Sequence, residues 1–207
     1  LATFTAAERK ALSALIEKKS EPVSAFENLG AVFAGRTPRM WTLDELSAAA
    51  DTGLKGRDFA NGRKMFAAAA CYACHRFRDG GGMNGPDLTG AGGRYSARDL
   101  LDQILHPSKE INEQFAPVVI ALNNGDVVSG VIVNLNGDQV TLNTDLSDPN
   151  QRVVVDRKLV TSMEVSKISS MPPMLLSMLT QEEILDLVAY VLSGGKPEHA
   201  MFKAQGK

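Results

Sequence analysis

The sequence predicts a mainly helical domain with a small inserted antiparallel sheet, which makes the chain α+β overall. Segments with helical spacing of apolar residues and helix-capping signals stand towards both ends of the chain. Between about residues 115 and 166, short β-rich runs alternate with turn residues instead. At 207 residues the chain can form one large domain or two small ones.

Composition and charge exclude several classes of protein. The hydrophobic share of 44% and the charged share of 22% are those of an ordinary globular domain. A formal charge of −2 gives no electrostatic support to nucleic-acid binding. No apolar run reaches the roughly 20 residues that a transmembrane helix needs. Because the chain starts at Leu1 and shows no signal peptide, we expect a processed protein or an excised fragment.

Residues 1–52 are predicted to form short helices. The runs Thr5–Glu8 and Thr42–Glu45 match the capping box, in which a hydroxyl and a carboxylate satisfy free backbone amides. No cluster of metal-ligating or catalytic residue types accompanies them. We therefore expect a packing role for this segment, or the end of an upstream domain, and place the main domain at residues 53–207.

The main domain is predicted to open with a helix over residues 57–70. Phe59, Met65 and Phe66 form its apolar side. Gly62 lies inside this helix, where glycine costs about 1 kcal/mol relative to alanine. A glycine at such a position indicates the close approach of another element.

The run Cys71-Tyr-Ala-Cys74-His75 is the attachment signature of a c-type haem. Two thiols one helical turn apart can add to the two vinyl groups of one porphyrin, and the following imidazole then becomes the proximal ligand of the iron. Cys71 and Cys74 account for both cysteines of the chain, so no thiol is left for a disulfide or a four-thiolate metal site. The sequence therefore predicts one covalently attached haem c.

Two other kinds of site use a Cys-x-x-Cys pair. A thioredoxin-like redox site should open a helix after a core strand, whereas an alanine-rich helical stretch precedes this pair. A zinc site needs further ligands at close spacing, and His106 and His199 are isolated in the sequence. We therefore favour haem over both alternatives.

Two longer helices and a sheet are predicted after the motif. The helices run from Ser96 to Leu105, before His106-Pro107, and from Thr180 to Ser193, before two glycines. The strands are expected at 117–122, 127–135, 139–143, 152–156 and 160–165. Because these strands carry no His, Cys or Trp, we expect the sheet to cover the haem or to dock a partner.

Gly85-Pro86-Asp87-Leu88 follows the cysteine motif closely enough to loop beneath His75. A ligating imidazole needs an acceptor that orients its other ring nitrogen. We predict that the carbonyl of Pro86 accepts the proton from His75. The alternative is an ordinary glycine-proline turn.

The sixth ligand of the iron decides the function, because methionine raises the reduction potential and an open position admits small molecules. Met171 is the main candidate, since the two prolines after it restrict the loop and help to hold a weak thioether ligand. Met174 and Met178 lie close by, and Met83 is a remote candidate. Alternatively, the first three only fill the pocket. The expected apolar wall consists of Phe66, Phe77, Leu88, Tyr95, Leu100 and Ile104.

These features together resemble the class I cytochromes c. The family's order is met by Gly62 with Phe66, the cysteine motif, Gly85-Pro86, Met171-Pro172 and a final helix containing Tyr190. The resemblance implies a cytochrome c fold in which Gly62, Phe66 and Tyr190 meet. Residues 57–194 also resemble a haem-binding cytochrome c domain family of planctomycetes and verrucomicrobia, which carries a strand-rich insertion before the ligand methionine.

The resemblance implies single-electron transfer and no catalysis by this chain. The iron would be ligated by His75 and Met171, and a redox partner or a fused dehydrogenase domain would supply the electrons. The main alternative is a gas sensor or a peroxidase with an open sixth site; for the acid–base group of a peroxidase the candidates are His106 and Arg94. A third is a purely structural or docking module. Since haem is attached covalently outside the cytoplasmic membrane, we expect a periplasmic or secreted protein.

Overall fold

The computed structural model describes residues 32–145, 148 and 150–203. The helix expected near Thr5 lies outside this range. Contacts divide the chain into two compact units, residues 1–35 and 36–207, and the fold given below is that of the second unit. In the described part of the chain, no helix is long and apolar enough to cross a bilayer.

The second unit begins at Arg36, whereas the predicted main domain begins at residue 53. Two polar contacts explain the difference. The guanidinium of Arg36 donates two hydrogen bonds, of 2.6 and 2.9 Å, to the carboxylate of Glu183, which lies 147 positions later in the sequence. Arg98 donates to the hydroxyl of Ser47 at 2.6 Å. The segment from 36 to 52 therefore packs within the same unit as the haem motif.

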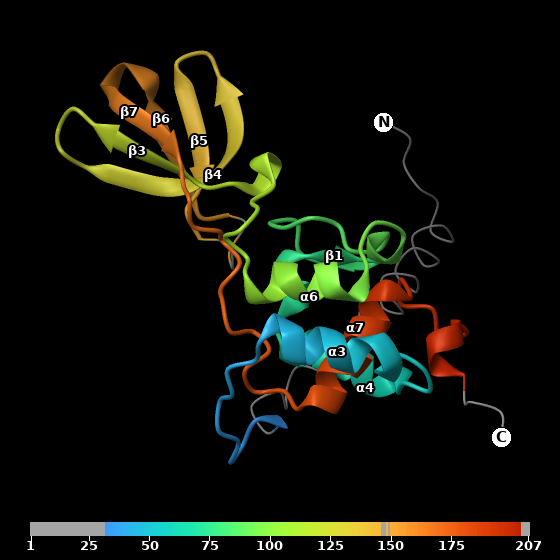
Figure 1. Ribbon diagram of the computed structural model, residues 1–207. Helices are drawn as coiled ribbons and strands as arrows, with labels where there is room; N and C mark the ends of the chain where they lie inside the picture. Colours follow the sequence, from blue (N-terminus) through green and yellow to red (C-terminus); the bar gives the residue numbers. More distant parts are fainter. Residues whose placement is uncertain (1–31, 146–147, 149, 204–207) are drawn as a thin grey trace, which may run out of the picture. The chain divides into compact units, whose positions relative to one another are not determined.

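The helices of this unit form its haem-motif region (Figure 1). They are α3 (Leu43–Gly53), α4 (Phe59–Ala68), α5 (Cys71–Cys74), α6 (Ala97–Leu105) and α7 (Gln181–Leu192). A small hairpin of β1 (Arg76–Phe77) and β2 (Gly80–Gly81) follows α5. The capping boxes expected at Thr42 and Thr180 are both present, because the hydroxyl and the Glu carboxylate three residues on exchange hydrogen bonds with backbone amides.

Helices α4 and α7 cross at Gly62. A Cβ atom here would collide with the carbonyl oxygen of Asp186 and would lie 2.8 Å from the Cβ of Tyr190. The carboxylate of Asp186 accepts from the amide of Asp58 at 3.1 Å and from the side chain of Asn61 at 2.8 Å, which ties α7 to the start of α4. Gly62 thus lets the two backbones approach closely.

The aromatic contact expected at this crossing is also present. The ring centroids of Phe66 on α4 and Tyr190 on α7 lie 5.7 Å apart. The hydroxyls of Tyr190 and Tyr72 are 2.9 Å apart, which links α7 to the cysteine motif. The meeting of Gly62, Phe66 and Tyr190 is therefore confirmed.

The inserted sheet has five antiparallel strands in the order β6-β5-β4-β3-β7. They are β3 (Val118–Leu122), β4 (Val127–Asn136), β5 (Gln139–Asn143), β6 (Arg152–Asp156) and β7 (Val160–Val165). The last three agree with the sequence prediction at both ends, and the first two differ by one residue at one end. The α+β class is confirmed.

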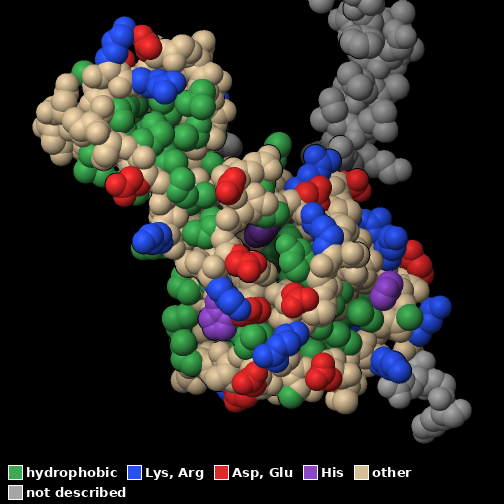
Figure 2. Space-filling view, turned by 45° about the horizontal axis from the view of Figure 1, so that its top comes forward, with side chains coloured by type: hydrophobic (Ala, Val, Ile, Leu, Met, Phe, Trp, Pro, Cys, Tyr) green, Lys and Arg blue, Asp and Glu red, His purple; other side chains and the backbone are tan. Residues whose placement is uncertain are grey.

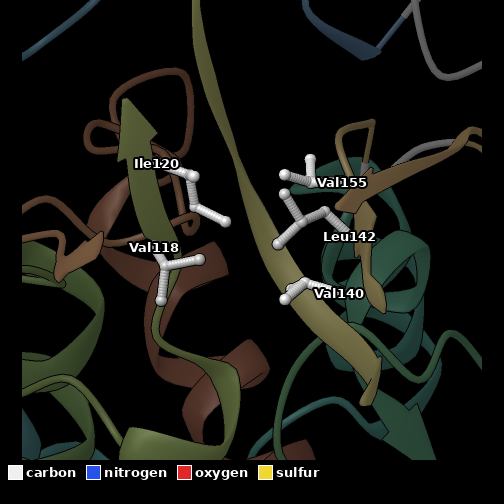
Figure 3. Packing of buried hydrophobic residues seen from close by; sticks show 5 residues of the cluster. All are labelled: Val118, Ile120, Val140, Leu142 and Val155. Atoms are coloured by element: carbon white, nitrogen blue, oxygen red, sulfur yellow. The ribbon is translucent and has the colours of Figure 1, made fainter. Parts of the chain in front are cut away.

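The long strand β4 divides the sheet into two halves. Its first part, Val127–Gly130, pairs with β3, and its second part, Val131–Asn136, pairs with β5. Side chains of β3 therefore point towards those of β5 and β6 (Figure 3). The core of the insertion that results consists of Val118, Ile120, Val140, Leu142 and Val155.

Replacing Gly62 with alanine should destabilise the fold. The added methyl group overlaps the backbone of α7, and this strain of about 1–3 kcal/mol exceeds the gain in helix propensity of about 1 kcal/mol. Gly90→Ala is the matched control, because nothing lies within 4 Å of a Cβ atom at that position. Denaturant unfolding of both variants tests this expectation, and equal midpoints would contradict the tight crossing.

The ion pair between Arg36 and Glu183 should make stability depend on pH. The guanidinium lowers the pKa of Glu183 from 4.5 to about 2, so the pair stabilises the fold above pH 4.5 and loses its effect as pH falls towards 2. Arg36→Met should cost about 1–2 kcal/mol at pH 7 and little near pH 2. The control Lys158→Met, which breaks an exposed pair with Asp138, should change little at either pH. Denaturant unfolding at pH 7 and near pH 2 gives the free energy of unfolding of each variant. A difference in that free energy between wild type and Arg36→Met that does not change with pH would contradict the role of the ion pair.

Candidate functional site

The cysteine motif occupies a single helical turn. After α4 ends, Ala70 adopts a left-handed backbone conformation with φ 57°, and α5 starts at the next residue. One turn then spans Cys71 to Cys74, and His75 leaves it in an extended conformation with φ −103°. Cys71, Cys74 and His75 consequently all line the same cavity.

The ring of His75 is oriented by main-chain atoms. Its Nδ1 lies 2.8 Å from the carbonyl oxygen of Pro86, which is the contact expected from the sequence. A carbonyl can only accept, so Nδ1 carries the proton and Nε2 keeps a free lone pair. Burial lowers the pKa of His75, although the bond to Pro86 opposes this effect. The ring is therefore held in the neutral form that metal ligation requires.

Gly85 lets the backbone pass directly against this ring. A Cβ atom at Gly85 would lie 2.8 Å from Cε1 and 2.9 Å from Nδ1 of His75. The amide of Gly85 donates to the carbonyl of Cys74 at 2.8 Å, which holds the two segments together. The sequence Gly85-Pro86 thus supplies both the space and the acceptor for the imidazole.

The cavity has a volume of about 360 Å³, within the range of ~300–1,000 Å³ that is usual for ligand sites. Figure 2 shows a hollow with apolar side chains in the helical part of the surface. Five of the six predicted wall residues line the cavity, namely Phe66, Leu88, Tyr95, Leu100 and Ile104. The prediction for Phe77 is wrong, because its ring packs in the core, 5.1 Å from those of Phe66 and Tyr190.

Among the eight methionines, Met171 is the one that lines the cavity. Met83 and Met174 are 79% and 50% exposed. Met178 is half-buried, and its carbonyl accepts from Arg36. The structure therefore brings Met171 together with Cys71, Cys74, His75 and Pro86, and leaves the other candidate methionines outside.

Charged side chains are scarce in the lining. Arg94 is its one cation and Glu110 its one carboxylate among the described residues. The guanidinium of Arg94 donates to the carbonyl of Asp87 at 2.7 Å, which fixes it at the cavity. His106 lies outside the lining and binds Asp102 at 2.6 Å. Of the two acid–base candidates for a peroxidase, only Arg94 reaches the cavity.

The thioredoxin and zinc alternatives find little support in the structure. A redox-active thiol has a lowered pKa, whereas burial raises the pKa of Cys71 to about 12 and raises that of Cys74 as well. Within residues 32–145, 148 and 150–203, no group of three or more His, Cys, Asp or Glu could hold a metal ion.

Sequence reasoning missed two parts of the wall. The segment after α6 contributes Pro107, Ile111, Asn112 and Phe115, and no motif marks it. Helix α7 contributes Leu187 and Val191, and its apolar spacing could have indicated this. None of the described residues of β3–β7 lines the cavity, so the suggestion that the sheet covers the haem finds no support here.

Comparison with known proteins agrees with the helical part of this site. Residues 59–118 match the family model of cytochrome c. The match spans α4, the cysteine motif and α6, and it ends before the loop of Met171. No curated protein matches the chain. Residues 59–118 are thus similar to cytochrome c, and domains of that family typically carry covalent haem and transfer electrons.

Replacing Gly85 with alanine should displace the ring of His75. The methyl group would push the ring of His75 away from Pro86, and loss of such an orienting contact should weaken the bond between His75 and a haem iron by about 10- to 100-fold. The control Gly80→Ala lies in the nearby hairpin, where a Cβ atom meets nothing within 4 Å. The haem content and spectrum of purified Gly85→Ala should therefore change while those of the control do not. An unaltered Gly85→Ala spectrum would speak against the close backbone contact.

Proposed function

We propose that the chain is a monohaem c-type cytochrome that transfers single electrons. In this proposal Cys71 and Cys74 hold the haem covalently, and His75 and Met171 are its axial ligands. The observation that carries the proposal is that all four residues line one cavity. The chemistry of these donors, two thiols with an imidazole and a thioether, matches haem c.

The rest of the lining fits the same cofactor. The apolar wall provides the dry surroundings that a porphyrin needs, and Arg94 supplies a positive charge for a propionate. When bound, haem supplies an iron that alternates between ferric and ferrous states. The chain keeps water away, orients the imidazole of His75 through Pro86, and presents Met171 at the cavity.

An open sixth site is less well supported. Met171 lies in the cavity lining, and His106, one of the acid–base candidates, is engaged with Asp102 outside it. We therefore prefer electron transfer to the gas-sensor and peroxidase alternatives. The proposal gives the chain no catalytic step of its own.

The electron donor we propose is a redox partner protein or a dehydrogenase domain fused to this one. A periplasmic or secreted location follows from the haem, because its covalent attachment takes place outside the cytoplasmic membrane. The sheet of β3–β7, which contributes no wall to the cavity, remains available for docking such a partner.

Replacing Met171 with alanine should open the sixth position. The ferric protein should lose its weak far-red charge-transfer band, bind carbon monoxide rapidly when reduced, and show a reduction potential lower by ~100 mV or more. Met174→Ala is the matched control, because that side chain is 50% exposed and outside the lining. An unchanged spectrum in Met171→Ala, or the same loss in Met174→Ala, would refute the ligand assignment.

A further inference from the structure

Two serine hydroxyls connect the loop of Met171 to the turn after α6. The amide of Ser169 donates to Oγ of Ser108 at 3.0 Å. The amide of Met171 then donates to Oγ of Ser169 at 3.2 Å. Two hydrogen bonds, one from the amide and one to the hydroxyl of Ser169, thus link the turn at residue 108 to the backbone of the proposed ligand.

The turn that contains Ser108 is itself held by a backbone hydrogen bond. Lys109 donates its amide to the carbonyl of His106 at 2.9 Å, which closes the turn. Pro107, within it, is buried and lines the cavity. Ser108 is itself exposed and directly follows Pro107, so its hydroxyl links the loop of Met171 to a residue that borders the cavity wall.

The loop is also fixed on both sides of Met171. Where the chain leaves the sheet, the amide of Ser166 donates to the carbonyl of Pro117 at 2.8 Å. After Met171, Pro172 and Pro173 restrict the backbone. These constraints shorten the free part of the loop, so that a single hydrogen bond at Ser169 can decide where Met171 points.

We propose that Ser108 and Ser169 are positioning residues for Met171 as the sixth ligand, an inference that rests on the proposed function. A thioether is a weak ligand, so the fraction of time it spends on the iron depends on how well its loop is preorganised. Without the two hydroxyls the loop samples more conformations, and the sixth position opens more often.

Cyanide titration of the ferric holoprotein measures this opening, because cyanide has to displace Met171. Ser108→Ala and Ser169→Ala should each raise the apparent cyanide affinity roughly two- to tenfold, the effect of one lost hydrogen bond. Ser108→Thr keeps a hydroxyl and should restore the wild-type affinity. The matched control is Ser166→Ala, whose hydroxyl bonds only to the backbone of Ile168 among the contacts described, at 3.0 Å.

Met171→Ala in the same titration separates the two proposals. If it raises cyanide affinity strongly while Ser108→Ala and Ser169→Ala keep wild-type values, the positioning role is overturned and the ligand assignment stands. If it leaves the affinity unchanged, Met171 is not the ligand and both proposals fail. An equal rise in Ser166→Ala would indicate general loosening of the loop and would also overturn the positioning role.

Discussion

The crossing of α4 and α7 at Gly62 is the constraint on which the haem-motif region depends. Since Gly62 has no Cβ atom, the backbone of α7 at Asp186 approaches α4 closely, and Asp186 in turn binds the start of α4. The crossing presents Phe66 from α4 and Leu187 from α7 to the same cavity. The crossing thereby positions part of the cavity wall next to the cysteine motif, which follows α4 directly in the sequence.

The two sides of the proposed haem site are built differently. On the side of His75, main-chain atoms of Gly85 and Pro86 contact the ring, so the imidazole has little freedom. On the side of Met171, a half-buried loop is held by prolines and by hydroxyl groups of partly exposed serines. If His75 and Met171 ligate a haem iron as proposed, this arrangement would hold His75 in place and make ligation by Met171 depend on its loop, which would adjust the potential of the iron.

Much of this fold follows from local signals in the sequence. The turn residues delimit the strands correctly, the capping boxes mark the starts of helices, and the cysteine motif with Gly85-Pro86 indicates the contact between His75 and Pro86. Features that depend on distant contacts could not be predicted in this way. Phe77 is apolar and close to the motif, yet in β1 its side chain is buried against Tyr190 rather than in the cavity. The start of the unit at Arg36 depends on Glu183, which lies 147 positions away.

Local sequence signals also give only part of the choice among the methionines. The sequence favours Met171 through its neighbouring prolines, whereas nothing local in the sequence indicates that Met174 is 50% exposed and adopts a left-handed backbone conformation with φ 67°. Similarly, the segment from Pro107 to Phe115 lines the cavity because of where α6 ends in space, and not because of a motif.

Everything proposed for this site depends on haem that is bound covalently through Cys71 and Cys74. The most direct test is the intact mass of the purified protein after denaturation, recorded together with its visible spectrum. We predict a mass increased by one haem that survives denaturation and is absent when both cysteines are replaced by alanine. An unmodified, colourless polypeptide from cells that attach haem to other c-type cytochromes would contradict the account.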